Sequence, residues 1–116
     1  MNRSVALLLL LYVAACGRSA VPFRVTVESL TGRRRFTIVG VPGARINARL
    51  KPALELEDGV VLRFNSSHLT PDSAYFADPP TVEASLSQGA HRGLVRASVC
   101  PAGEEICRSV ALAVRF

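Results

Sequence analysis

The fold is decided by residues 94–116, which read LVRASVCPAGEEICRSVALAVRF. Two stretches in which apolar and polar residues alternate flank a short segment that begins with Cys100 and ends with Cys107. If Cys100 lies opposite Cys107 in an antiparallel pair, the register of the whole hairpin follows. Apolar pairs then share one face (Ala97–Val110, Val95–Leu112, Gly93–Val114), and the cysteine face carries Ser98–Ser109 and Arg96–Ala111. The pattern predicts a closing β-hairpin with one face in a core and both sulfurs on the polar face, within reach of solvent and of a partner protein.

The cysteine pair has two interpretations. A disulfide here would close an eight-residue loop and contribute about 2 to 2.5 kcal/mol in the chain-entropy description. Alternatively, the pair is a redox couple, in which a partner's thiolate attacks an exposed disulfide. Glu104 and Glu105 disfavour a strongly acidic thiol, because nearby negative charge opposes the thiolate. No C-x-x-C motif is present. Composition and spacing alone therefore favour a structural staple.

The rest of the domain shows the same period of two. Further strands are expected at Phe23–Glu28, Phe36–Val41, Arg45–Leu50, Leu54–Leu56, Val60–Phe64 and Val82–Leu86, with turns near 31–33, 40–43, 58–59 and 87–93 and a long loop from Asn65 to Pro80. No segment has a helical period. The sequence predicts an all-β protein, an antiparallel immunoglobulin-like β-sandwich of seven to eight short strands. A small barrel is the alternative.

Composition restricts the possible functions. With 116 residues, 49% of them hydrophobic and 20% charged, the chain is typical of one small globular domain and is too short for the large catalytic folds. The net charge is +5, but the arginines that dominate it are scattered and there is no Trp. Without interleaved aromatic and basic residues, nucleic acid is not expected as a partner.

The N-terminus is typical of an export signal. Arg3 provides a positive start, and Val5–Ala15 is an apolar run whose helical length of roughly 16 Å is too short to span a ~30 Å bilayer core. Val13-Ala14-Ala15-Cys16 resembles the bacterial lipobox, which implies cleavage before Cys16 and lipidation of that cysteine. We therefore expect a signal peptide over residues 1–15, a lipidated tether over 16–20 and a domain over 21–116. An uncleaved membrane anchor is the alternative.

Lipidation would place the domain in the cell envelope, facing the periplasm or the exterior of a bacterium. Such a compartment permits a disulfide between the two remaining cysteines. Gly17–Ala20 extend over no more than roughly 14 Å, so the domain is expected to work close to its membrane. Arg18 and Arg33–Arg35 can contact anionic lipid. For Arg33–Arg35, a solvated hairpin tip is the favoured alternative.

The closing segment Val99–Arg108, with the strand Ser109–Phe116, resembles the end of the periplasmic N-terminal domain of the DsbD thiol:disulfide interchange family. The resemblance implies an immunoglobulin-like sandwich whose last hairpin passes reducing equivalents to extracytoplasmic redox partners such as thioredoxin-like proteins. It also implies that Cys107 forms mixed disulfides and that Cys100 resolves them. The stretch Asp72–Phe76 resembles that family's cap segment, which implies that Tyr75 or Phe76 covers the cysteines. Packing of this loop into the core is the alternative.

Other candidate sites are weak. His68 and His91 are far apart in sequence and lack a carboxylate cluster at ligand spacing, so no metal and no cofactor are expected. Ser66, Ser67 and Asp72 lie near His68 without a nucleophile-elbow motif, and polar loop chemistry explains them. The expected function is lipid-anchored thiol-disulfide exchange through Cys100 and Cys107. The alternatives are a non-catalytic binding or assembly module with a structural disulfide, and a subunit that docks a larger complex to the membrane.

Overall fold

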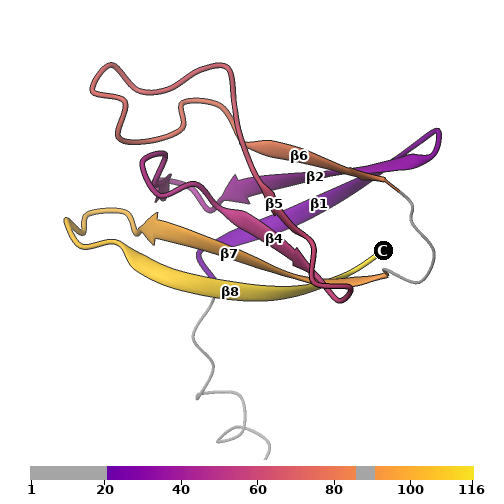
Figure 1. Cartoon of the computed structure of the whole chain (residues 1–116). Coiled ribbons are helices and arrows are strands. Elements are labelled where there is room, and N and C mark those ends of the chain that lie inside the picture. The colour runs from indigo at the N-terminus through magenta and orange to yellow at the C-terminus, as the bar shows by residue number, and fades with distance from the viewer. Residues whose placement is uncertain (1–20, 86–90) are drawn as a thin grey trace, which may run out of the picture.

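A computed structural model describes residues 21–85 and 91–116, which form eight strands in two antiparallel sheets (Figure 1). The expected signal peptide (1–15), Cys16, the tether (16–20) and most of the expected turn at 87–93 lie outside these residues. Within the described part there is no helix long and apolar enough to cross a membrane. The all-β class and the number of strands agree with the sequence pattern.

The first sheet has the order β1-β2-β6, with β1 at Phe23–Leu30, β2 at Arg33–Gly40 and β6 at Thr81–Ser85. A two-residue turn, Thr31-Gly32, joins β1 to β2, and Gly32 adopts a positive φ of 70° there. Strand β2 begins three residues earlier than expected. Its three arginines lie next to the tip of this hairpin, where each of them pairs with a residue of β1 and a residue of β6; Arg33, directly after the turn, is exposed.

The second sheet is built around β7 (Arg92–Cys100). Strand β8 (Arg108–Arg115) lies on one side of it, and β3 (Arg45–Ile46) and β4 (Ala53–Leu56) lie on the other. Strand β5 (Val61–Arg63) pairs with β4. If β3 and β4, which lie one after the other along the same side of β7, are counted together as strand C, the two sheets correspond to the immunoglobulin orders A-B-E and G-F-C-C′. The immunoglobulin-like sandwich predicted from the sequence is therefore the observed architecture.

The register of the closing hairpin is also as predicted. Ser98 pairs with Ser109, Arg96 with Ala111, Ala97 with Val110 and Val95 with Leu112. The expected apolar face is the buried one, where Val95 and Val99 have no exposed surface. These side chains join buried residues of the other sheet in one core (Phe36, Ile38, Phe23 and Ala84 from that sheet; Leu54, Leu56, Ile46 and Ala97 from their own).

Other strand boundaries also differ from the sequence pattern. The strand expected over Arg45–Leu50 ends after Ile46, because the Asn47 side chain accepts hydrogen bonds from the N–H groups of Arg49 and Leu50 and turns the chain. At the closing hairpin the sequence pattern predicts a last strand over Ile106–Phe116, but β8 begins at Arg108 and Ile106 lies in the loop.

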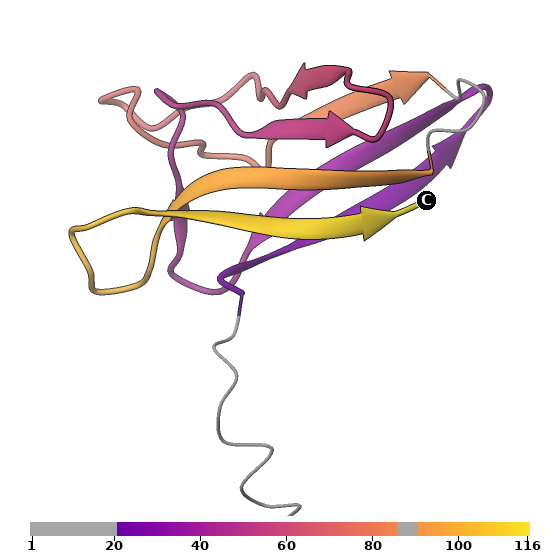
Figure 2. The same ribbon diagram turned by 60° about the horizontal axis from the view of Figure 1, so that its bottom comes forward.

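The sandwich has two distinct ends. The start of β1, the β2–β3 loop and the loop between β7 and β8 lie together at one end, shown at the left of Figure 2. We call this the disulfide end. The C-terminus, the β1–β2 turn and the β4–β5 turn lie at the opposite end. At the disulfide end the N–H of Val41 donates to the Pro22 carbonyl at 3.0 Å, and a Cβ on Gly43 would lie 2.6 Å from the Ala102 Cβ. The three segments are therefore in contact.

Candidate functional site

Cys100 and Cys107 form a disulfide at the base of the loop that joins β7 to β8. Cys100 is the last residue of β7, and Cys107 directly precedes β8. The intervening residues, 101–106, form the cysteine loop. The two sulfur-bearing residues are not equivalent, because Cys100 is completely buried and Cys107 is partly exposed.

The expectation that solvent reaches both cysteines is thus correct only for Cys107. Cys100 belongs to the central strand of its sheet, and its backbone pairs with Arg45 of β3. A third segment, the long loop between β5 and β6, supplies the cover over its side chain. The burial of Cys100 therefore depends on its place in a central strand and on a loop that is distant in the sequence. The alternating pattern of the hairpin residues carries no information about either.

Tyr75 is the residue of the long loop that meets the disulfide. Its hydroxyl lies 3.7 Å from the Cys100 Sγ, within hydrogen-bonding distance for sulfur. A disulfide sulfur carries no hydrogen, so the hydroxyl is the donor. Tyr75 forms an isolated bridge with Asn47, and the next residue, Phe76, donates its N–H to the Ile46 carbonyl at 3.1 Å. These backbone contacts hold the loop beside β3.

Phe76, the other expected cap residue, packs against the hydrophobic core. Adjacent residues in an extended segment point to opposite sides, so only one of the two aromatic rings can face the sulfurs. Both interpretations of this segment therefore apply, each to a different residue. Tyr75 contacts Cys100, and Phe76 anchors the loop by packing.

Arg45 is a part of the site that the sequence did not indicate. Its guanidinium carbon lies 4.6 Å from the centroid of the Tyr75 ring, and its Nη2 donates to the Glu104 carbonyl at 3.1 Å. A cation over an aromatic face is worth about 0.5 to 1 kcal/mol at exposed sites. Arg45 thereby connects the cover to the cysteine loop and brings positive charge near Cys100.

A hydrogen-bonded turn positions Tyr75. The Asp72 carboxylate accepts from the Thr70 hydroxyl at 2.6 Å and from the Ala74 N–H at 3.1 Å. These two donors, in that order, hold the pKa of Asp72 below its ordinary value. Thr70 also accepts a hydrogen bond from the Tyr75 N–H at 3.2 Å. The acidic residue of the expected cap segment therefore acts on the conformation of the loop rather than on the sulfurs.

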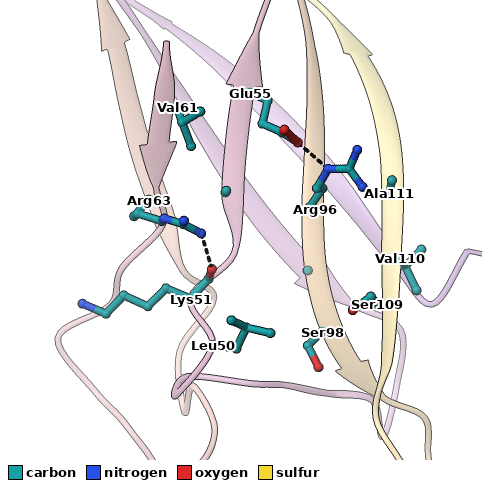
Figure 3. Close-up of a pocket in the computed structure, with 12 residues that line it drawn as sticks. Leu50, Lys51, Glu55, Val61, Arg63, Arg96, Ser98, Ser109, Val110 and Ala111 are labelled. Carbon is teal, nitrogen blue, oxygen red and sulfur yellow. Dashed lines mark hydrogen bonds and ion pairs between the residues drawn. The ribbon is translucent and has the colours of Figure 1, made fainter. Parts of the chain in front are cut away.

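A shallow groove of about 420 Å³ lies on the cysteine face of the second sheet. Small side chains of β4, β7 and β8 lie on it, namely Ala53, Ser98, Ser109 and Ala111. Figure 3 shows Glu55 and Arg96 pointing toward each other between β4 and β7, where they form an ion pair. Arg63 donates to the Lys51 carbonyl at 3.3 Å. Because Ser98 lies two residues before Cys100 on the same strand face, the groove leads toward the disulfide.

The remaining polar residues of the long loop do not form a catalytic arrangement. Ser67 and Asp78 both approach Nδ1 of His68, at 3.1 and 2.6 Å. A hydrolytic triad needs its serine on one ring nitrogen and its carboxylate on the other. In residues 21–85 and 91–116, no group of three or more metal-ligating side chains is close enough to hold a metal ion.

Comparison with known proteins identifies no relative: no family model, curated protein or solved structure matches the chain.

Proposed function

We propose that the chain is a lipid-anchored, extracytoplasmic domain that takes part in thiol-disulfide exchange through Cys100 and Cys107. The observation that carries this proposal is the unequal exposure of the two cysteines. A bond that serves only to close a loop gains nothing from distinguishing its sulfurs. Exchange, in contrast, requires one sulfur that a partner can reach and another that can leave.

The reaction starts at Cys107. A partner thiolate attacks the Cys107 Sγ, a partner–Cys107 bond forms and the Cys107–Cys100 bond breaks. The electron pair of the broken bond passes to Cys100, which becomes a thiolate and takes up a proton from water. The partner's second thiolate then attacks the partner sulfur of the mixed disulfide and releases Cys107. Two electrons thereby pass from the partner dithiol to the domain, and the same steps in reverse reduce a partner disulfide.

Tyr75 and Arg45 support the departure of Cys100. The Tyr75 hydroxyl, 3.7 Å from the sulfur, can donate a hydrogen bond to the thiolate as it forms. Arg45 stacks on the Tyr75 ring and contributes positive charge nearby. These groups oppose the effect of the acidic residues of the cysteine loop, of which Glu104 is paired with Arg108 at 3.5 Å.

The first test is the reduction potential of the disulfide, measured on residues 17–116 by equilibration with glutathione or dithiothreitol and trapping of free thiols. We expect a value of roughly −270 to −120 mV, the range of redox proteins, and a folded reduced form. A value below about −300 mV, together with unfolding on reduction, would identify the bond as a staple and refute the proposal.

Two single-cysteine variants test the assignment of the attacked sulfur. Cys100→Ser leaves the exposed thiol and Cys107→Ser leaves the buried one. With a small aromatic disulfide reagent, Cys100→Ser is expected to react roughly tenfold faster or more, because access limits the buried thiol. Adding Tyr75→Ala to Cys107→Ser should raise the reaction rate of the Cys100 thiol toward that of the exposed thiol, because the cover over it is removed. Equal rates in the two single variants would contradict the assignment.

A non-catalytic binding module is the second candidate function. The groove over β4, β7 and β8 supports it, since three cationic side chains (Lys51, Arg63 and Arg96) and only one carboxylate, that of Glu55, line it. Such a surface suits an acidic, extended segment of an envelope protein. The potential measurement separates the two candidates, because a binding module does not need a reducible bond.

A further inference from the structure

The described chain begins at the disulfide end of the sandwich. Pro22 accepts a hydrogen bond from Val41 of the β2–β3 loop, and that loop contacts the cysteine loop through Gly43 and Ala102. Figure 2 shows the start of β1 on the same side of the molecule as the loop between β7 and β8. A membrane anchor at Cys16 is separated from Val21 by only four residues, whose extended length is roughly 14 Å. The disulfide end is therefore the end nearest the anchor.

Exposed apolar side chains occur on all three segments of this end. Ile106 of the cysteine loop is 76% exposed, the most of any large apolar residue in the described part of the chain. Val41 of the β2–β3 loop and Val21 at the start of the described chain are also exposed. Large apolar side chains on adjoining loop tips suit the boundary between lipid headgroups and acyl chains.

The charges at this end do not oppose contact with lipid. Around the cysteine loop, Arg45 and Arg108 balance Glu104 and Glu105, so that neither anionic nor neutral lipid is repelled. The arginine run lies at the opposite end, where the β1–β2 turn is. Two of its members are already paired: Arg33 with Glu83 at 2.8 Å, and Arg35 with both Glu83 and Glu28. Glu83, the closer partner, contributes most to raising the pKa of Arg35.

We propose that the disulfide end rests on the lipid bilayer, with Val21, Val41 and Ile106 in the interfacial layer. This inference rests on the lipid anchor of the proposed function and extends it by giving the domain an orientation. Cys107 then lies at the membrane surface, and the thiols that exchange with it must be presented there. The fitting partner is a membrane-bound protein with a cysteine pair near the bilayer.

The absence of Trp from the chain allows a clean test with single tryptophans. Val41 and Val60 make a matched pair, because both are exposed valines outside strands, 43% and 45% exposed, at opposite ends of the sandwich. The Val41→Trp and Val60→Trp proteins, produced from the full chain in a bacterial host, are mixed with phosphatidylcholine vesicles with or without brominated acyl chains, which quench tryptophan only at short range. Flotation of the vesicles reports anchoring separately.

We expect brominated lipid to lower the Val41→Trp emission about twofold and to leave Val60→Trp unchanged, since the opposite end is further from the bilayer by roughly the 25 Å length of an eight-residue strand. Adding Ile106→Glu to Val41→Trp should reduce the quenching while the protein still floats. If both proteins float and Val41→Trp is not quenched more than Val60→Trp, the orientation is wrong although the anchor stands. If neither protein floats, the anchor itself is refuted, and the orientation with it.

Discussion

The β1–β2 and β7–β8 hairpins are alike in their strands and different at their tips. Each pairs two long antiparallel strands in continuous register. The first closes with the two residues Thr31 and Gly32. The second closes with a seven-residue segment, a disulfide and contacts from Arg45 and Tyr75, which lie far away in the sequence. A two-residue turn is enough to close the first hairpin. The need to close a hairpin therefore does not explain the disulfide and the contacts of Arg45 and Tyr75 at the second.

The largest loss of stability is expected from a substitution in the core that the two hairpins share. Phe36 of β2 is fully buried, and its ring meets the ring of Phe116, the residue after β8, edge-on at 5.0 Å. Phe36→Ala should lower the free energy of unfolding in urea by about 3 to 5 kcal/mol, through lost burial and a cavity. Val27→Ala, in the same hairpin but at an exposed residue, should change it by about 0.5 kcal/mol or less.

If Phe36→Ala does not fold, Phe36→Leu provides a milder version of the same change, with a cost of about 1 kcal/mol. A Phe36 variant as stable as Val27→Ala would mean that the hairpins do not depend on a common core.

Removing the disulfide tests whether the second hairpin needs its cross-link. In a Cys100→Ala, Cys107→Ala double variant the free energy of unfolding should fall by about 2 to 2.5 kcal/mol, because the unfolded chain regains the entropy of an open loop. The sheet should persist, since alternation along β7 and β8 sets the register. Circular dichroism and urea unfolding of the variant, beside the reduced and oxidised natural chain, check both points. Loss of β-structure would show that the bond is needed for the fold.

Two glycines compare the tips directly. Gly32 and Gly43 have similar positive φ values, 70° and 82°, so that alanine is strained at either position. A Cβ at Gly32 meets nothing within 4 Å, whereas one at Gly43 would lie 2.6 Å from the Ala102 Cβ. Gly32→Ala should cost about 1 kcal/mol of stability, and Gly43→Ala about 1 kcal/mol more, because the cysteine loop must shift.

Adding Ala102→Gly to Gly43→Ala should recover part of that difference, as measured by urea unfolding. Equal costs for the two single variants would mean that the β2–β3 loop and the cysteine loop are not in firm contact.

The sequence predicted those features of the fold that depend on local alternation. The pairing of β7 with β8, down to individual partners such as Ser98 with Ser109, followed from placing Cys100 opposite Cys107, and the apolar residues that this register gathers on one face supported it. The prediction from alternation was wrong after Ile46. There the side-chain oxygen of Asn47 accepts hydrogen bonds from the backbone N–H groups of Arg49 and Leu50, so β3 ends early. A short polar side chain within an otherwise regular strand pattern was the available signal.

The candidate site was predictable only in part. The two cysteines left in an export compartment indicated the disulfide, and the resemblance of Asp72–Phe76 to a cap segment implied a cover. Which ring faces Cys100 depends on how a loop without periodicity lies against β3, and no repeating pattern encodes that. The contact of Arg45 with Tyr75 joins residues thirty positions apart, so its arginine was indistinguishable in sequence from the others on the surface.

The smallest expected effect concerns the turn that positions Tyr75 and has no counterpart in the first hairpin. Hydrogen bonds from Thr70 and Ala74 hold the pKa of Asp72 below its ordinary value of 3.8. The folded state therefore gains stability from the ionised carboxylate above that value, and loses it as the pH falls through the lower pKa of the folded protein. Asp72→Asn keeps an acceptor but does not titrate, so its stability should depend less on pH below about pH 4.

Urea unfolding of both proteins from about pH 6 to about pH 2 isolates this one carboxylate, because all other acidic groups are shared. Tyr75 is the only tyrosine in residues 21–116, so its near-ultraviolet circular dichroism reports the cover locally. We expect that signal to weaken in acid for the natural chain before the sheets unfold, and to persist further into acid for Asp72→Asn. Parallel pH profiles in the two proteins would mean that Asp72 does not hold the cover, and that backbone contacts with β3 suffice to keep Tyr75 over Cys100.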